Sequence, residues 1–150
     1  MMSENLNRVK LSQWDALILE SLRTLGWSDD ELLRRVASGE LPVDESEFHF
    51  DYKQLAVLQA EQPELFERAV REGYQIKYNT IRGVRSWIFV ALGKEPVLEL
   101  EPGKEAVEVS LTAAEKARLE GVLSFGWEIH EGTGASDAET SSYRIEPVQR

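Results

Sequence analysis

The chain of 150 residues contains no cysteine. This absence excludes disulfide bonds, thiolate nucleophiles and cysteine-ligated zinc, and it favours a reducing compartment, the cytoplasm. No apolar stretch approaches the roughly 18 residues that a membrane-spanning helix needs. Residues 1–10 are polar and lack the basic and then apolar pattern of a signal peptide. The sequence therefore predicts a soluble, cytoplasmic protein that does not bind a membrane.

Residue patterns that carry chemistry are also scarce. The two histidines, His49 and His130, are not spaced as metal ligands, and His130 lacks the second histidine of a zinc-binding helix. The glycine-rich stretch 132–134 has neither the lysine nor the strand-to-helix context of a phosphate-binding loop. No Gly-x-Ser-x-Gly nucleophile elbow occurs. We therefore expect no catalytic residue, no metal and no cofactor, and a protein that is not an enzyme.

Negative charge dominates the chain, but one segment departs from it. The formal net charge is −10. Residues 73–94 nevertheless contain Lys77, Arg82, Arg85 and Lys94 and no acidic residue. A chain that is acidic overall repels nucleic acid at long range. Any nucleic-acid binding would therefore have to be local to this basic segment.

The first 93 residues carry repeated helix-start and helix-stop signals. Serine, threonine or aspartate caps, apolar residues at helical spacing and terminating glycines follow one another along this part of the chain. The predicted helices cover 12–26, 28–39, 51–58, 63–73 and 80–93. Residues 74–92 leave both strand and helix open, since Tyr74, Ile76 and Tyr78 alternate as in a strand. The cap at Thr80 favours a helix, although Gly83 inside it costs on the order of 1 kcal/mol relative to alanine.

The last third of the chain changes to a strand pattern. Apolar residues flank the turn sequence Glu-Pro-Gly-Lys at 101–104, which predicts a β-hairpin. Thr112 and Glu115 can cap a further helix, and 127–130 and 143–148 have the composition of strands. Between them, 131–142 has the composition of a long mobile loop. The predicted order of elements is ββαββ.

The fold class predicted from these patterns is α+β, with an N-terminal helical half followed by a ββαββ antiparallel sheet half. We expect residues 1–10 to be a disordered N-terminus, 11–93 to form the helical region and 95–150 to form the ββαββ region. The two regions can pack together as one compact body.

Two segments resemble each other at an offset of one hundred residues. Leu11, Leu19, Glu20, Gly26 and Trp27 are identical to their counterparts in the segment 111–127. The pattern fits a duplicated unit that presents tryptophan on two related surfaces. It also fits a shared local sequence of cap, apolar stripe, terminating glycine and aromatic residue, and this second interpretation is favoured because the following residues differ and no third copy exists.

The leading functional hypothesis is a non-catalytic regulatory or adaptor protein that binds another macromolecule, with a protein as its partner. Arginine and large aromatic residues anchor interfaces, so Trp87 beside Arg82 and Arg85 is predicted to be an exposed anchor. The alternative is a DNA- or RNA-binding regulator that uses an imperfect helix-turn-helix-like segment, 64–93. In that hypothesis Arg82 and Arg85 lie near the start of the second helix and Lys77 contacts phosphate.

Overall fold

The computed structural model describes residues 8–46, 48–132 and 139–148. The five helices predicted for the N-terminal region are confirmed within these residues, and their bounds are as follows: α1 (Gln13–Arg23), α2 (Asp29–Ser38), α3 (Lys53–Glu61), α4 (Pro63–Glu72) and α5 (Ile81–Leu92). The predicted caps are present at three of them, because the side-chain oxygens of Ser12, Ser28 and Thr80 each accept a backbone N–H bond. Glycines in the left-handed conformation end α2 and α5.

A two-stranded parallel sheet interrupts the helical region. Strand β1 (Val9–Leu11) pairs with β2 (Tyr74–Ile76). The expectation that residues 1–10 are disordered is therefore wrong for Val9 and Lys10, while 1–7 lie outside the described residues. Both strands are only three residues long, and each finds its hydrogen-bond partner more than sixty residues away in the chain. A pattern read in short windows does not reveal such a pair.

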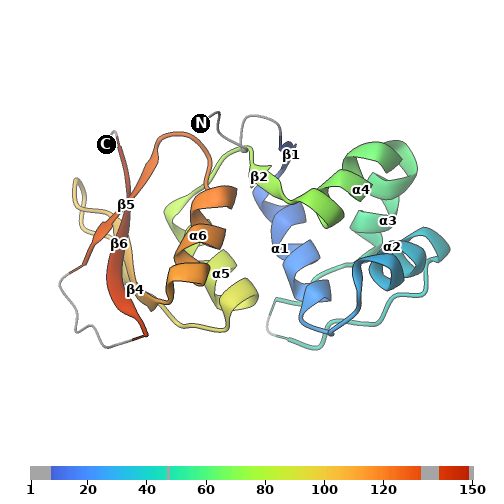
Figure 1. The fold of residues 1–150 in the computed structure, drawn as a ribbon, viewed down its shortest axis with the longest axis horizontal. Helices are drawn as coiled ribbons and strands as arrows, with labels where there is room; N and C mark the ends of the chain where they lie inside the picture. Colours follow the sequence, from blue (N-terminus) through green and yellow to red (C-terminus); the bar gives the residue numbers. More distant parts are fainter. Residues whose placement is uncertain (1–7, 47, 133–138, 149–150) are drawn as a thin grey trace.

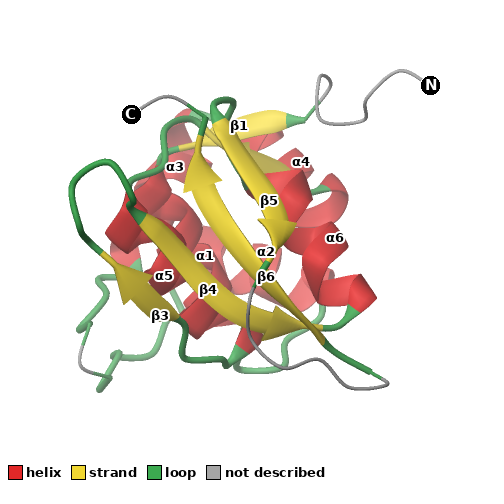
Figure 2. Cartoon of the chain, turned by 90° about the vertical axis from the view of Figure 1, so that its left-hand side faces the viewer, coloured by secondary structure: helices red, strands yellow, loops and turns green. Residues whose placement is uncertain are grey.

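The C-terminal region confirms the predicted ββαββ order. Its elements are β3 (Val97–Glu99), β4 (Ala106–Leu111), α6 (Ala113–Val122), β5 (Trp127–Glu131) and β6 (Ser141–Pro147). The strands form one antiparallel sheet in the order β3-β4-β6-β5. Figure 2 shows the sheet with the helices behind one of its faces. The predicted loop 131–142 is too long at both ends, because Glu131 belongs to β5 and Ser141 and Ser142 belong to β6. Residues 133–138 of that loop lie outside the described residues.

The elements follow one another in layers along the long axis of the molecule. Figure 1 shows the four-stranded sheet at one end, then α5 and α6, then α1 with the β1–β2 pair, and finally α2, α3 and α4. One hydrophobic core runs through these layers, because buried residues of the helical region and of the sheet belong to the same cluster. In the described part of the chain no helix has the length and apolar character needed to cross a bilayer.

Close packing of α5 on α1 explains the glycine inside α5. A Cβ atom at Gly83 would lie 1.9 Å from the side-chain amide of Gln13. The same amide caps α5, since its Oε1 accepts a 2.9 Å hydrogen bond from the backbone N–H of Thr80. The glycine that argued against a helix therefore leaves the space that the Gln13 amide occupies where it caps α5.

Candidate binding surface

The structure places Trp87 in the core. Its side chain is 1% exposed, and its indole N–H donates a 2.8 Å hydrogen bond to the hydroxyl of Tyr74. The prediction that Trp87 is an exposed anchor is therefore wrong. The reason is helical geometry, because Trp87 lies three residues after the buried Val84 and so shares its face.

Trp87 belongs to a polar network that joins four elements. Tyr74 donates a 2.5 Å hydrogen bond to Glu20, whose side chain is 1% exposed, and Arg118 donates another of 2.5 Å to the same carboxylate. The Arg118 guanidinium also lies over the Trp87 ring at 5.3 Å from its centroid. Burial, together with the neighbouring Glu20 carboxylate, holds the pKa of Tyr74 well above its usual value. These contacts tie α1, β2, α5 and α6 together in the interior, where they stabilise the fold.

The three predicted basic residues do not gather around one anchor. Lys77 and Arg82 are exposed, at the end of β2 and in the first turn of α5. Arg85 is partly covered, since its guanidinium lies 3.6 Å from Glu95 and 5.3 Å from the centroid of the Phe89 ring. Of the four predicted site residues, Lys77 and Arg82 are thus the ones with exposed side chains.

The segment 64–93 differs from a helix-turn-helix in its connection. Strand β2 lies between α4 and α5 and pairs with β1, where a helix-turn-helix has a tight turn. Helix α5 contacts α1 on one side and the strands β3 and β4 on the other. Figure 1 shows it in the middle of the molecule, whereas a recognition helix needs a free face for the major groove.

Exposed apolar side chains converge at a different place. Among the described residues nine large hydrophobic side chains are exposed, and three of them, Tyr78, Phe125 and Val148, border one hollow of about 490 Å³. Tyr78 is 77% exposed and Phe125 is 67% exposed. The half-buried Trp127 borders the same hollow. We call Tyr78, Phe125, Trp127 and Val148 the aromatic surface.

Hydrogen bonds hold the backbone segments that carry the aromatic surface. The backbone N–H of Asn79 donates to the hydroxyl of Ser124 at 3.1 Å, and the backbone N–H of Ser124 donates to the Asn79 side chain at 2.7 Å. Both residues are buried. A 2.7 Å hydrogen bond from the N–H of Val148 to the carbonyl of Gly126 holds the segment that carries Val148. The side chains of the surface are therefore exposed although the backbone beneath them is held by hydrogen bonds.

A second hollow, also of about 490 Å³, adjoins the first and shares the segment 124–127 with it. It extends along β5 and is bordered by Gln75 of β2 and by the exposed Glu120 and Glu128. The Gln75 side-chain N–H donates a 2.9 Å bond to the carbonyl of Leu123 and so holds the start of this segment. The second hollow therefore has acidic side chains along its sides and adjoins the aromatic surface at one end. We call it the acidic hollow.

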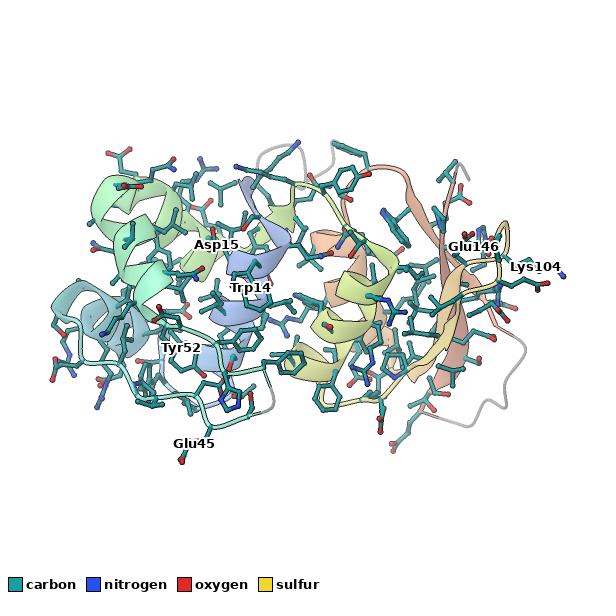
Figure 3. The ribbon with its side chains drawn as sticks, turned by 180° about the vertical axis from the view of Figure 1, so that it is seen from behind. Trp14, Asp15, Glu45, Tyr52, Lys104 and Glu146 are labelled. Carbon is teal, nitrogen blue, oxygen red and sulfur yellow. The ribbon has the colours of Figure 1, made fainter. Side chains whose placement is uncertain are left out.

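Charge differs around the two hollows and on the sheet. The ammonium of Lys10 lies 5.2 Å from the centroid of the Phe125 ring, so a basic group adjoins the aromatic surface. The outer face of the sheet is charged, and Figure 3 shows Glu146 and Lys104 there, on the side away from the helices.

Within the described ranges no group of three or more His, Asp or Glu side chains is arranged to hold a metal ion.

The sequence prediction missed Tyr78, Phe125 and Trp127 as members of one surface. A usable signal was present in Ser124-Phe125-Gly126-Trp127, where an aromatic residue directly precedes a turn glycine and so is not covered by a helix or a strand. The contact that brings Tyr78 to this turn joins residues that are 45 positions apart. A local sequence pattern does not encode a contact between residues so far apart in the sequence.

No protein-family model matches the chain, and no curated protein or solved structure shows significant similarity to it.

Proposed function

We propose that the chain is a non-catalytic regulatory or adaptor protein that binds a partner protein through the aromatic surface. The observation that carries this proposal is the convergence of Tyr78, Phe125 and Val148 on one hollow beside Trp127. Tyrosine and tryptophan are the residue types that most often dominate interface energetics, in pockets that lose their water on binding.

The fixed backbone beneath the surface supports the same function. Binding is opposed by the ordering of loops and side chains, which costs about 0.5–1.5 kcal/mol for each flexible side chain. The paired bonds between Asn79 and Ser124 already order the two segments that carry Tyr78 and Phe125. A partner therefore meets a preformed surface. The cysteine-free composition supports a cytoplasmic location for this encounter.

Site-specific photo-crosslinking tests the proposal. A photoreactive phenylalanine analogue at Phe125 is compared with the same analogue at Leu25, which is 47% exposed and occupies the equivalent position in the segment 11–27. We expect Phe125 to yield a discrete crosslinked protein in extract of the native cell, and Leu25 to yield none. With the identified partner, Phe125→Ala and Tyr78→Ala should each weaken binding at least fivefold, because a hot-spot residue contributes more than about 1 kcal/mol.

Leu25→Ala is the matched control and should leave the affinity unchanged. Because all three substitutions are at exposed side chains, each should alter the free energy of unfolding by less than about 0.5 kcal/mol. A partner that binds Phe125→Ala and Tyr78→Ala as tightly as the unaltered chain contradicts the proposal.

A second candidate function is single-stranded nucleic-acid binding. The observation in its favour is that Lys10 lies over the Phe125 ring and that Lys77 is next to Tyr78 in the chain. Sites for single strands combine aromatic rings, on which the bases stack, with basic side chains that contact the phosphates. If Lys10, Lys77 and Arg82 contact phosphates, each should contribute about 0.7 to the slope of a log–log salt plot for a single strand. We expect no such binding at physiological salt, because the net charge is −10. Tight salt-sensitive binding of oligonucleotides that is lost on changing Lys10 and Lys77 to alanine would favour this second function.

A further inference from the structure

Strand β5 lies at an edge of the four-stranded sheet, and within residues 8–46, 48–132 and 139–148 no strand pairs with its outer side. The N–H of Gly132 bonds to the carbonyl of Ser142, and the N–H of Val148 bonds to the carbonyl of Gly126. In an antiparallel pair the bonded positions alternate, so the even-numbered residues of β5 direct their backbone groups to β6. Trp127, Ile129 and Glu131 therefore direct their N–H and C=O groups away from the sheet.

The open edge is suited to accept another strand. β5 is five residues long, whereas the opposite edge strand β3 has three. Its sequence contains neither proline nor lysine, two residues that often protect sheet edges from pairing. The acidic hollow borders the same strand over 127–130. An added strand would thus have both backbone partners and a space in which its side chains can lie.

The charges at this edge select the chemistry of the incoming segment. Glu120 and Glu128 border the hollow, and the exposed Glu131 ends the strand. His130 lies 2.8 Å from Glu128 and 3.5 Å from Glu146, so carboxylates also surround the imidazole. A second copy of the chain would bring the same carboxylates and a second net charge of −10 to this edge. A basic segment is complementary to it.

We propose that the edge of β5 binds an extended, basic segment of a partner protein, which adds to the sheet as a fifth strand. The segment forms backbone hydrogen bonds with Trp127, Ile129 and Glu131 and places lysine or arginine side chains near Glu120 and Glu128. An apolar residue at one end contacts Phe125, because that residue borders both hollows. This inference rests on the proposed function and specifies how the partner is recognised.

Amide hydrogen exchange on the intact chain tests the backbone contacts. The probes are two pools of short peptides that alternate valine with a charged residue, one with lysine and arginine, the other with aspartate and glutamate. We expect the basic pool to bind and the acidic pool not to bind. On binding, the amides of Trp127, Ile129 and Glu131 should exchange at least tenfold more slowly, while those of Glu128 and His130 should change less because β6 already protects them.

Two pairs of variants sharpen the test. Ile129→Pro removes an N–H that the β5–β6 ladder does not use, and Ile129→Ala controls for the lost side chain. The proline variant should bind the basic pool at least tenfold more weakly than the alanine variant. Glu120→Lys should also weaken binding of the basic pool, whereas Glu64→Lys on α4, which changes the net charge equally, should not.

Three results of the peptide experiments would overturn the inference. They are failure of the basic pool to bind, binding without protection of the three amides, and concentration-dependent protection without any peptide, which would indicate self-association. Partner crosslinking at Phe125 that persists in Ile129→Pro would overturn the strand addition and leave the proposed function intact. Loss of crosslinking in the unaltered chain would instead refute the proposed function.

Discussion

The segments 11–27 and 111–127 follow the same local sequence and end in different surroundings. Each leads from a strand, β1 or β4, through a hydroxyl cap into a helix, α1 or α6, and then to a glycine and a tryptophan. Leu19 and Leu119 are both buried, and Gly26 and Gly126 both have positive φ, at 84° and 96°. The local pattern therefore sets the start of both helices and the position of one buried leucine. The helix ends differ, because the residue after α1, Thr24, is in the right-handed helical conformation and the residue after α6, Leu123, is extended.

The partners of the two segments differ. Glu20 is buried in α1 and bonded to Arg118, whereas the identical Glu120 is exposed in α6 beside the acidic hollow. The ring of Trp27 is covered by Arg35 at 4.7 Å, but Trp127 begins the edge strand β5 and borders both hollows. What a repeated residue does is thus decided by the element that packs on it. This difference predicts unequal effects of equivalent substitutions.

The largest difference is expected at the two glutamates. Glu20→Ala leaves the Tyr74 hydroxyl without its acceptor and Arg118 without its carboxylate, so the free energy of unfolding should fall by about 2–4 kcal/mol. Glu120→Ala changes an exposed side chain and should cost less than about 0.5 kcal/mol. Urea unfolding followed by tryptophan fluorescence measures both variants. Equal losses would mean that the two segments are also equivalent in their packing.

The two turn glycines should give matching, smaller effects. Gly26→Ala and Gly126→Ala each place a Cβ in a left-handed conformation, which costs about 1–2 kcal/mol, and neither Cβ would meet another atom within 4 Å. We expect the same loss of stability from both, measured as shifts of the urea midpoint at constant slope. If Gly126→Ala costs several times more than Gly26→Ala, the β5 edge must contribute strain that the local geometry does not contain.

The smallest effect is expected at the caps, and it depends on pH. Burial alone would raise the pKa of Glu115, but the nearby Lys94 ammonium at 2.7 Å and the N–H of Thr112 outweigh it and lower that pKa. A carboxylate with a lowered pKa stabilises the fold at pH values above its pKa in the unfolded chain, near 4.3. This stabilisation is lost as the pH falls through the lower pKa of the folded state.

Glu115→Gln should therefore cost about 0.5–1 kcal/mol at neutral pH and progressively less as the solution is acidified below about pH 4. The equivalent Asp15→Asn should cost less at neutral pH, because among the described residues the contact of Asp15 is its backbone N–H bond to the Ser12 hydroxyl. Denaturant titrations across the acidic range compare the two. A cost of Glu115→Gln that stays constant down to pH values below the folded pKa would show that the charge is not its source.

The elements that sequence analysis predicted are those encoded locally. The caps at Ser12, Thr80 and Thr112 and the turn at 101–104 each depend on residues within a few positions of one another. Strand β1 was not predicted, because three residues are too few to show a periodic pattern and the strand that pairs with them is distant in the chain. Helix boundaries were thus accessible, and the parallel pair was not.

The candidate site was harder to predict for the same reason. Charge at Arg82 and Arg85 suggested an exposed Trp87, although helical spacing from Val84 already indicated a buried position. Tyr78 and Phe125 become neighbours on one hollow only through the contact between Asn79 and Ser124. A surface built from two distant turns has no signature in either turn alone.

The bond between Glu20 and Arg118 also bears on the time at which the molecule can assemble. The two residues are separated by 98 positions, and Tyr74 lies 54 positions from the same carboxylate. During synthesis from the N-terminus, α1 is complete long before α6 exists. Until Arg118 is made, packing of α1 would enclose a carboxylate without its countercharge, so we expect the helices to form early and to dock fully only once α6 is present. We therefore expect long-range closure of the chain, and not the fast formation of its helices, to limit the rate of folding.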